Sequence, residues 1–83
     1  MAYKIAFKSS VQRDLKQIDK ADAKLILEKI ESELIEKADK VPLLTGKFKG
    51  LRKYRIGPYR VIFTLRHDTV LILRISHRKD AYR

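Results

Sequence analysis

The chain has 83 residues and no cysteine, which suits one domain over residues 1–83 and excludes disulfide bonds, thiolate metal ligands and a cysteine nucleophile. Charges interrupt every hydrophobic run, so no stretch reads as a signal peptide or a membrane span, and we expect a soluble cytoplasmic protein. Its 20 Lys and Arg against 10 Asp and Glu give a formal net charge of +10, which favours a polyanionic partner.

The chain opens with an expected strand and a short helix. In "AYKIAFK" the apolar side chains alternate with the others, which is the period of a half-buried strand. Ser9 and Gln12 follow at the spacing of a capping box, so Ser9 is predicted to begin a helix. The apolar stripe of that helix would consist of Val11, Leu15 and Ile18.

A second, longer helix is predicted through "ADAKLILEKIESELIEKADK", with Asp19 or Asp22 as its N-cap. Its apolar residues recur at helical spacing: Ala23, Ile26, Leu27, Ile30, Leu34 and Ala38. Its outer face pairs opposite charges four residues apart, Lys24 with Glu28 and Lys29 with Glu33. We interpret this half as a solvated helical hairpin whose charges have no functional role.

The segment "VPLLTGKFKG" ends the helical pattern, because Pro42 disfavours helix at Val41 and two glycines allow turns. Three strand-like segments follow, "RKYRIG", "YRVIFTLR" and "TVLILRISH", separated by Gly57-Pro58 and His67-Asp68 at hairpin spacing. The predicted fold class is α+β. An N-terminal strand, a helical hairpin and a three-strand antiparallel meander would form one mixed sheet packed on the helices.

Alternation along these strands predicts two different faces of the sheet. The apolar face would carry Tyr54, Ile56, Tyr59, Val61, Phe63, Leu65, Leu71, Leu73 and Ile75. The other face would carry Lys53, Arg55, Arg60 and Arg74, closed at one edge by His77, Arg78 and Tyr82.

The positive charge is confined to the second half of the chain. Residues 1–39 hold eight basic and eight acidic side chains, whereas residues 40–83 hold twelve basic ones and only Asp68 and Asp80 as acids. Nucleic acid is the leading candidate partner for such a distribution. A chain that is basic only for solubility stays as an alternative, and membrane-surface binding is disfavoured because the excess charge is not on an amphipathic helix.

The stretches "KFKGLRKYRIGPYRVIF" and "VLILRISHRKDAY" resemble the RelE/ParE superfamily of toxins from toxin–antitoxin modules, and the resemblance spans the whole chain. It implies a RelE-like fold and, for RelE-type members, an endoribonuclease that uses no metal or cofactor and cuts mRNA, in many cases only in the ribosomal A site. It also implies a RelB-like antitoxin that binds the toxin in a hetero-oligomer. Two alternatives stay open: a ParE-like toxin that inhibits DNA gyrase without chemistry, and a nucleic-acid-binding regulator with a decayed site.

The same resemblance assigns residue roles. Arg60 is similar to the arginine that contacts the scissile phosphate and Arg78 to the second such arginine, while Tyr82 is similar to a tyrosine that stacks on or acts at the reacting nucleotide. His77 matches only the branches that carry histidine before the arginine. The RNA-binding set would comprise Lys53, Arg55, Arg74, Lys47, Lys49 and Arg52. Structural alternatives also exist: Arg60 could pair with a helix carboxylate, Tyr82 could pack over the sheet edge, and His77 could cap a strand end.

These residue types suit RNA cleavage on chemical grounds. RNA carries its own nucleophile, the 2′-hydroxyl, so the protein has to orient it, move protons and stabilise negative charge at the phosphorus. A fixed guanidinium can supply the last of these, at about 3–4 kcal/mol per well-placed donor. His77 is the one histidine of the predicted site, and histidine is the usual side chain for proton transfer near neutral pH. The spatial hypothesis is that Arg60 and Arg78 meet around one phosphodiester. No paired carboxylates, metal-ligand cluster or glycine-rich phosphate loop supports a glycosidase, a metallonuclease or an NTPase.

Overall fold

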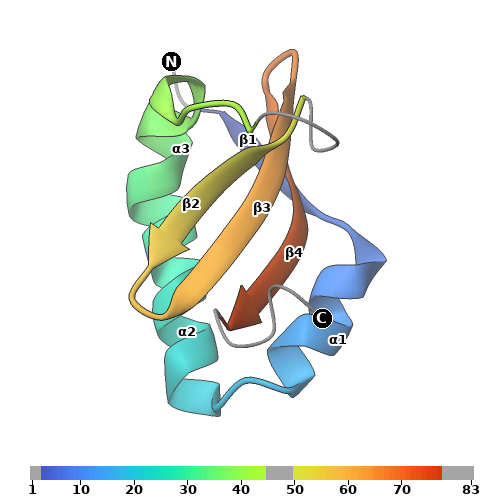
Figure 1. Cartoon of the computed structure of the whole chain (residues 1–83), viewed down its shortest axis with the longest axis vertical. Helices are drawn as coiled ribbons and strands as arrows, with labels where there is room; N and C mark the ends of the chain where they lie inside the picture. Colours follow the sequence, from blue (N-terminus) through green and yellow to red (C-terminus); the bar gives the residue numbers. More distant parts are fainter. Residues whose placement is uncertain (1–2, 45–49, 78–83) are drawn as a thin grey trace.

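The computed structural model describes residues 3–44 and 50–77, which form a four-stranded sheet with helices against it (Figure 1). The elements in chain order are β1 (Lys4–Phe7), α1 (Ser9–Lys16), α2 (Lys20–Lys29), the π-helical turn η1 (Ile30–Leu34), α3 (Ile35–Lys37), the 3₁₀ turn η2 (Ala38–Lys40), β2 (Arg52–Ile56), β3 (Tyr59–Arg66) and β4 (Thr69–His77). Within these residues, no helix is long and apolar enough to span a membrane.

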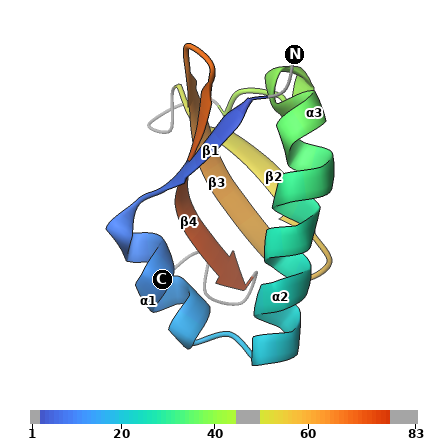
Figure 2. The ribbon, with the colours of Figure 1, turned by 180° about the vertical axis from the view of Figure 1, so that it is seen from behind.

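The sheet has the strand order β1-β4-β3-β2. Strands β2, β3 and β4 form an antiparallel meander, whereas β1 runs parallel to β4, from Lys4 opposite Thr69 to Phe7 opposite Ile72. The continuous helical run from α2 to η2 covers one face of the sheet, and α1 lies beside β4 (Figures 1 and 2). The predicted fold class, a mixed sheet packed on helices, is confirmed.

The core lies between the long helical run and the covered face of the sheet. Ile26, Ile30 and Leu34 recur every four residues, and all three are fully buried. Across from them, β3 contributes Val61 and Phe63, which are also fully buried because alternate residues of a strand share a face. The helical stripe and the apolar face of β3 are therefore as the sequence predicts.

Strand β4 departs from the predicted alternation. Its buried residues are Val70, Ile72 and Ile75, so the prediction that Leu71 and Leu73 join the core is wrong. The register shifts where Phe63 pairs with Ile72 and its neighbour Ile62 pairs with Arg74, which leaves Leu73 as an extra residue. Such a β-bulge reverses the alternation of inward and outward side chains, and a strict two-residue period cannot anticipate it.

The two helix starts differ in how well the sequence predicts them. The N-cap of α1 is Lys8 and it has no side-chain cap, so the capping box proposed for Ser9 is wrong. The N-cap of α2 is Asp19, whose carboxylate accepts a hydrogen bond from the Ala21 N–H at 3.2 Å, as predicted. The two hairpin turns also fall where expected, with positive φ angles at Gly57 (56°) and His67 (55°).

Candidate nucleic-acid interface

The face of the sheet that the helices leave open carries the predicted cations. Residues directly opposite each other in paired strands point to the same side. One row across the sheet consists of Arg55, Arg60 and Ser76, and the next row consists of Lys53, Ile62 and Arg74. We call Lys53, Arg55, Arg60 and Arg74 the cationic face. Neighbouring strands are about 4.8 Å apart, so these four residues can act on one polyanion.

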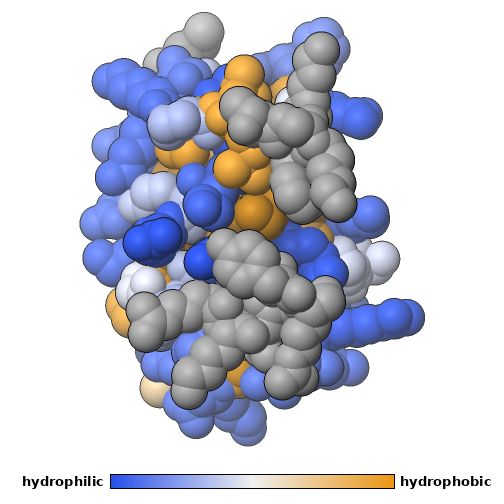
Figure 3. Space-filling model, in the orientation of Figure 1, coloured by the Kyte–Doolittle hydropathy of each residue, from blue (hydrophilic) through white to orange (hydrophobic). Residues whose placement is uncertain are grey.

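The cationic face continues into an apolar strip. The outward-facing residues include Ile62 and, one row further along the sheet, Leu71 opposite Thr64. Figure 3 shows the open face, with an apolar strip along its middle and hydrophilic residues around it. The open face therefore offers both positive charge and apolar surface.

Arg60 is partly shielded from water where β3 begins. The residue is half-buried and its Nε atom is fully buried. Together with Arg55 and the β2–β3 turn it lines a hollow of about 110 Å³. A guanidinium that is partly shielded from water interacts more strongly with developing negative charge than one in bulk solvent.

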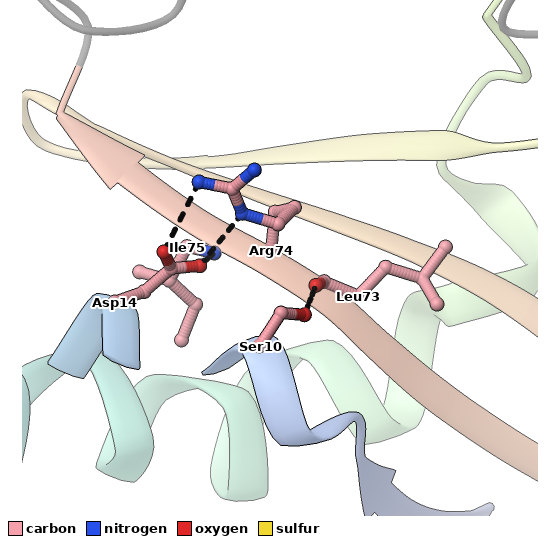
Figure 4. A network of polar contacts seen from close by, with 5 residues as sticks. All are labelled: Ser10, Asp14, Leu73, Arg74 and Ile75. Atoms are coloured by element: carbon pink, nitrogen blue, oxygen red, sulfur yellow. Dashed lines mark hydrogen bonds and ion pairs between the residues drawn. The ribbon is translucent and has the colours of Figure 1, made fainter. Parts of the chain in front are cut away.

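Arg74 is oriented by a helix. Its Nε and Nη2 atoms donate hydrogen bonds to the two carboxylate oxygens of Asp14 in α1, at 3.0 and 3.1 Å (Figure 4). The hydrogen bonds and charge of Asp14 raise the pKa of Arg74 above its ordinary value, so Arg74 stays positively charged. No pattern in the sequence indicates this pair, because its members lie 60 residues apart.

Arg52 is not brought to the cationic face. It pairs with Phe63, which points into the core, so Arg52 lies on the helix-covered side. Its Nη1 atom donates hydrogen bonds to the backbone oxygens of Asp39 and Val41, at 3.4 and 2.5 Å. These contacts give Arg52 a structural role where the long helical run ends, on the side away from the cationic face, and the RNA-binding role of Arg52 stays a prediction.

His77 lies on the same side as the helices. It pairs with Tyr59, and the two rings meet edge to face with centroids 5.3 Å apart. The Tyr59 hydroxyl donates a hydrogen bond to Asp22 at 2.8 Å, and this bond raises the Tyr59 pKa. By register, Ser76, and not His77, shares the open face with Arg60. The structure therefore does not bring His77 and Arg60 together on one face.

Four predicted site residues lie outside the described residues: Lys47, Lys49, Arg78 and Tyr82. The meeting of Arg60 and Arg78 around one phosphodiester thus stays a prediction. Among the described residues, no group of three or more His, Asp or Glu side chains is arranged to hold a metal ion.

Comparison with known proteins agrees with the fold. Residues 5–82 match the family model described as the ParE toxin of the type II toxin–antitoxin system parDE. Toxin RelG of Mycobacterium tuberculosis is 31% identical over 90 aligned residues, which cover 100% of this chain and 99% of RelG. Toxin RelE3 of Methanocaldococcus jannaschii is 29% identical over 85 residues, which cover 95% and 94% of the two chains. Among solved structures, the toxin–antitoxin complex RelBE2 of M. tuberculosis contains a chain that superimposes with a TM-score of 0.88 at 27% identity, covering 94% of this chain and 100% of that one.

A helix-backed sheet with an open cationic face, together with these matches, defines a toxin of a type II toxin–antitoxin system. The chain belongs to the RelE/ParE superfamily.

Proposed function

We propose that this toxin is a RelE-type endoribonuclease that cleaves mRNA by attack of the substrate's own 2′-hydroxyl, without a metal or cofactor. The observation that carries the proposal is the register that places Arg55 and Arg60 in one row of the open face, with Lys53 and Arg74 in the next. The names of the similar proteins, RelG and RelE3, support the same branch of the superfamily.

In this proposal the residues of the open face have different roles. Arg60 contacts a non-bridging oxygen of the scissile phosphate, because its Nε atom is fully buried and the residue lines the hollow beside Arg55. Arg78 and Tyr82 complete the site from the segment that follows β4. Lys53 and the exposed Arg55 attract the RNA backbone, which makes their contribution sensitive to salt.

A RelB-like antitoxin is the proposed protein partner, since RelBE2 is a toxin–antitoxin complex. Its acidic residues would meet the cationic face, and its apolar residues would cover the strip that includes Ile62 and Leu71. Occupation of this face would exclude RNA. The proposed setting is the cytoplasm, where mRNA and the ribosomal A site are available.

A second candidate function is inhibition of DNA gyrase without chemistry, and the description of the matching family model as a ParE toxin favours it. A toxin of this kind would use the open face only to bind. It would have no need for a partly buried guanidinium in a row with a second cation.

One experiment separates the two functions. The purified chain is incubated with translating ribosomes and, separately, with supercoiled DNA and gyrase, and mRNA ends and DNA topology are measured. We expect new mRNA ends and unchanged topology. Arg60→Gln should slow cleavage about 10²–10³-fold, the range for loss of one transition-state donor.

The matched control is Lys24→Gln, which removes one positive charge from an exposed position of α2. We expect it to cleave at the wild-type rate. Intact mRNA together with altered DNA topology would overturn the proposal in favour of gyrase inhibition.

A further inference from the structure

Strand β4 is held at its outer edge in two different ways. Residues 69–72 pair with β1, and the Lys8 N–H donates the last backbone bond to the Ile72 oxygen. Beyond this point α1 takes the place of a strand. The Ser10 hydroxyl donates to the backbone oxygen of Leu73 at 2.7 Å, and the Asp14 carboxylate accepts from the Ile75 N–H at 2.8 Å (Figure 4).

The spacing of the two elements explains this match. Four residues of an α-helix rise about 6 Å, and two residues of a strand rise about 6.6 Å. Ser10 and Asp14 therefore reach two successive outward-facing backbone groups of β4, a carbonyl and an N–H. Side chains of α1 thus pair with backbone groups of a strand edge that would otherwise be open to pairing with another chain.

Asp14 does more than close this edge. Its carboxylate accepts hydrogen bonds from the Ile75 backbone and from two nitrogens of Arg74. The Asp14 side chain is only 11% exposed, whereas that of Arg74 is 60% exposed. The Arg74 nitrogen that Asp14 does not contact points away from α1 (Figure 4). One edge of the guanidinium is fixed by the helix, and the other edge is open to a ligand.

We infer that Asp14 is a positioning residue for RNA cleavage: it holds the Arg74 guanidinium as an oriented donor to a backbone phosphate next to the scissile one. This inference rests on the proposed function. Arg74 lies one row from Arg60 and Ser76, so a phosphate that it binds would neighbour the one at Arg60. A fork-shaped guanidinium suits this role, because it can serve a carboxylate on one edge and a phosphate on the other.

The first test compares Asp14→Asn with Ser10→Ala. Both variants weaken the contact between α1 and β4, but only Asp14→Asn releases Arg74. We expect Asp14→Asn to slow single-turnover cleavage about 10–100-fold, as small misplacements at a reacting centre do. Ser10→Ala should cleave at nearly the wild-type rate. Thermal unfolding establishes that both variants are folded, and a folded Asp14→Asn with the wild-type rate would overturn the inference.

The second test uses Arg74→Lys, which keeps the positive charge but loses the planar guanidinium that can contact two groups at once. We expect Arg74→Lys to lose about as much rate as Asp14→Asn, and the double variant to be no slower than the slower single one, because the two residues act as one unit. If the rate losses of the two single variants multiply in the double variant, Asp14 does not act through Arg74. If Asp14→Asn does not fold, Arg74→Lys alone decides, since a wild-type rate would exclude a need for orientation.

Failure of the proposed function gives a different result. A wild-type chain that cuts no RNA would overturn the nuclease proposal by itself. The same variants are then compared by growth inhibition in cells that lack the antitoxin. Weaker inhibition by Asp14→Asn and Arg74→Lys, but not by Ser10→Ala, would show that Asp14 positions Arg74 for a target other than RNA. Equal inhibition by all of them overturns the positioning role.

Discussion

The two faces of the sheet use the same strands for opposite purposes. In β3, Val61 and Phe63 are fully buried against the helices, whereas Arg60 and Ile62 point to the open face. Burial on one side supplies most of the stability of so small a domain, since apolar area removed from water contributes about 25 cal/mol per Å². The comparison teaches that the residues of the core and those of the proposed binding face are direct neighbours in the chain, so that substitutions can separate stability from the proposed activity.

The largest expected effect belongs to the covered face. Phe63→Ala removes a large, fully buried side chain and should lower the free energy of unfolding by about 3–5 kcal/mol. A domain of this size has only about 4–12 kcal/mol in total. Urea denaturation of the purified chain measures the loss. Ile62→Ala, the neighbouring position on the open face, is the control and should lose much less. Equal losses at the two positions would refute the two-face comparison.

Tyr59→Phe tests a polar contact on the covered face. The variant loses the hydrogen bond between the Tyr59 hydroxyl and Asp22 and should be less stable at pH 7 by about 0.5–1.5 kcal/mol. That bond, followed by burial, raises the folded-state pKa of Tyr59 above its ordinary value near 10. The bond therefore stabilises the fold fully below pH 10 and is lost as the pH rises through the raised pKa.

The measurement for Tyr59 is the difference in unfolding free energy between the wild type and Tyr59→Phe, followed from pH 7 upward. Using the difference cancels the alkaline titration of the lysines. We expect it to shrink above pH 10. A difference that stays constant at alkaline pH would show that the hydroxyl contributes by packing alone.

The sequence predicts the helical half of the core better than the part that β4 contributes, for physical reasons. Ile26, Ile30 and Leu34 follow a local period, so their burial is visible in the chain itself. The extra residue Leu73 leaves no local mark, because any of several neighbours could form a bulge. For this reason the two-residue period predicts the burial of Ile75 correctly but places the core residues before the bulge in the wrong phase.

The polar contacts around the site depend on distant pairs. Asp14 meets Arg74 across 60 residues and Tyr59 meets Asp22 across 37, and no spacing rule connects them. The cationic residues themselves are predictable, since alternation determines the face on which Lys53 and Arg55 lie. What the sequence leaves open is which cation is already engaged by a carboxylate, and this requires the three-dimensional structure.

Arg55→Gln tests the open face with a moderate effect. Arg55 is exposed and sits beside Arg60. The substitution should weaken binding of a single-stranded, non-cleavable RNA a few-fold for every sequence. It should also reduce the slope of log Kd against log salt concentration by about 0.7 for each phosphate that the variant no longer neutralises. Binding titrations at several salt concentrations measure both quantities. Lys24→Gln is again the control, and an unchanged slope for Arg55→Gln would remove Arg55 from the RNA-binding surface.

The smallest effects are expected where the long helical run meets the edge strand β2, because Glu33 has two partners there. Its carboxylate accepts a hydrogen bond from the Tyr54 hydroxyl at 3.0 Å and forms an ion pair with Lys29 at 3.4 Å. Both lower the Glu33 pKa below its ordinary value of 4.5, and the Tyr54 hydrogen bond does so most. The stabilisation from these contacts is present above pH 4.5 and is lost as the pH falls through the lowered pKa.

This ranking can be tested directly by titration of the Glu33 carboxyl with NMR in two variants. Tyr54→Phe should return the Glu33 pKa further toward 4.5 than Lys29→Ala does, because a hydroxyl that donates to a carboxylate acts at short range whereas an exposed ammonium is screened by water. Adding salt should shrink the effect of Lys29→Ala and leave that of Tyr54→Phe nearly unchanged. A larger shift of the Glu33 pKa in Lys29→Ala would mean that the charge of Lys29, and not the Tyr54 hydrogen bond, is the main cause of the lowered pKa. The open face and the surroundings of Glu33 would then differ only in the sign of the charged group, positive on the open face and negative at Glu33.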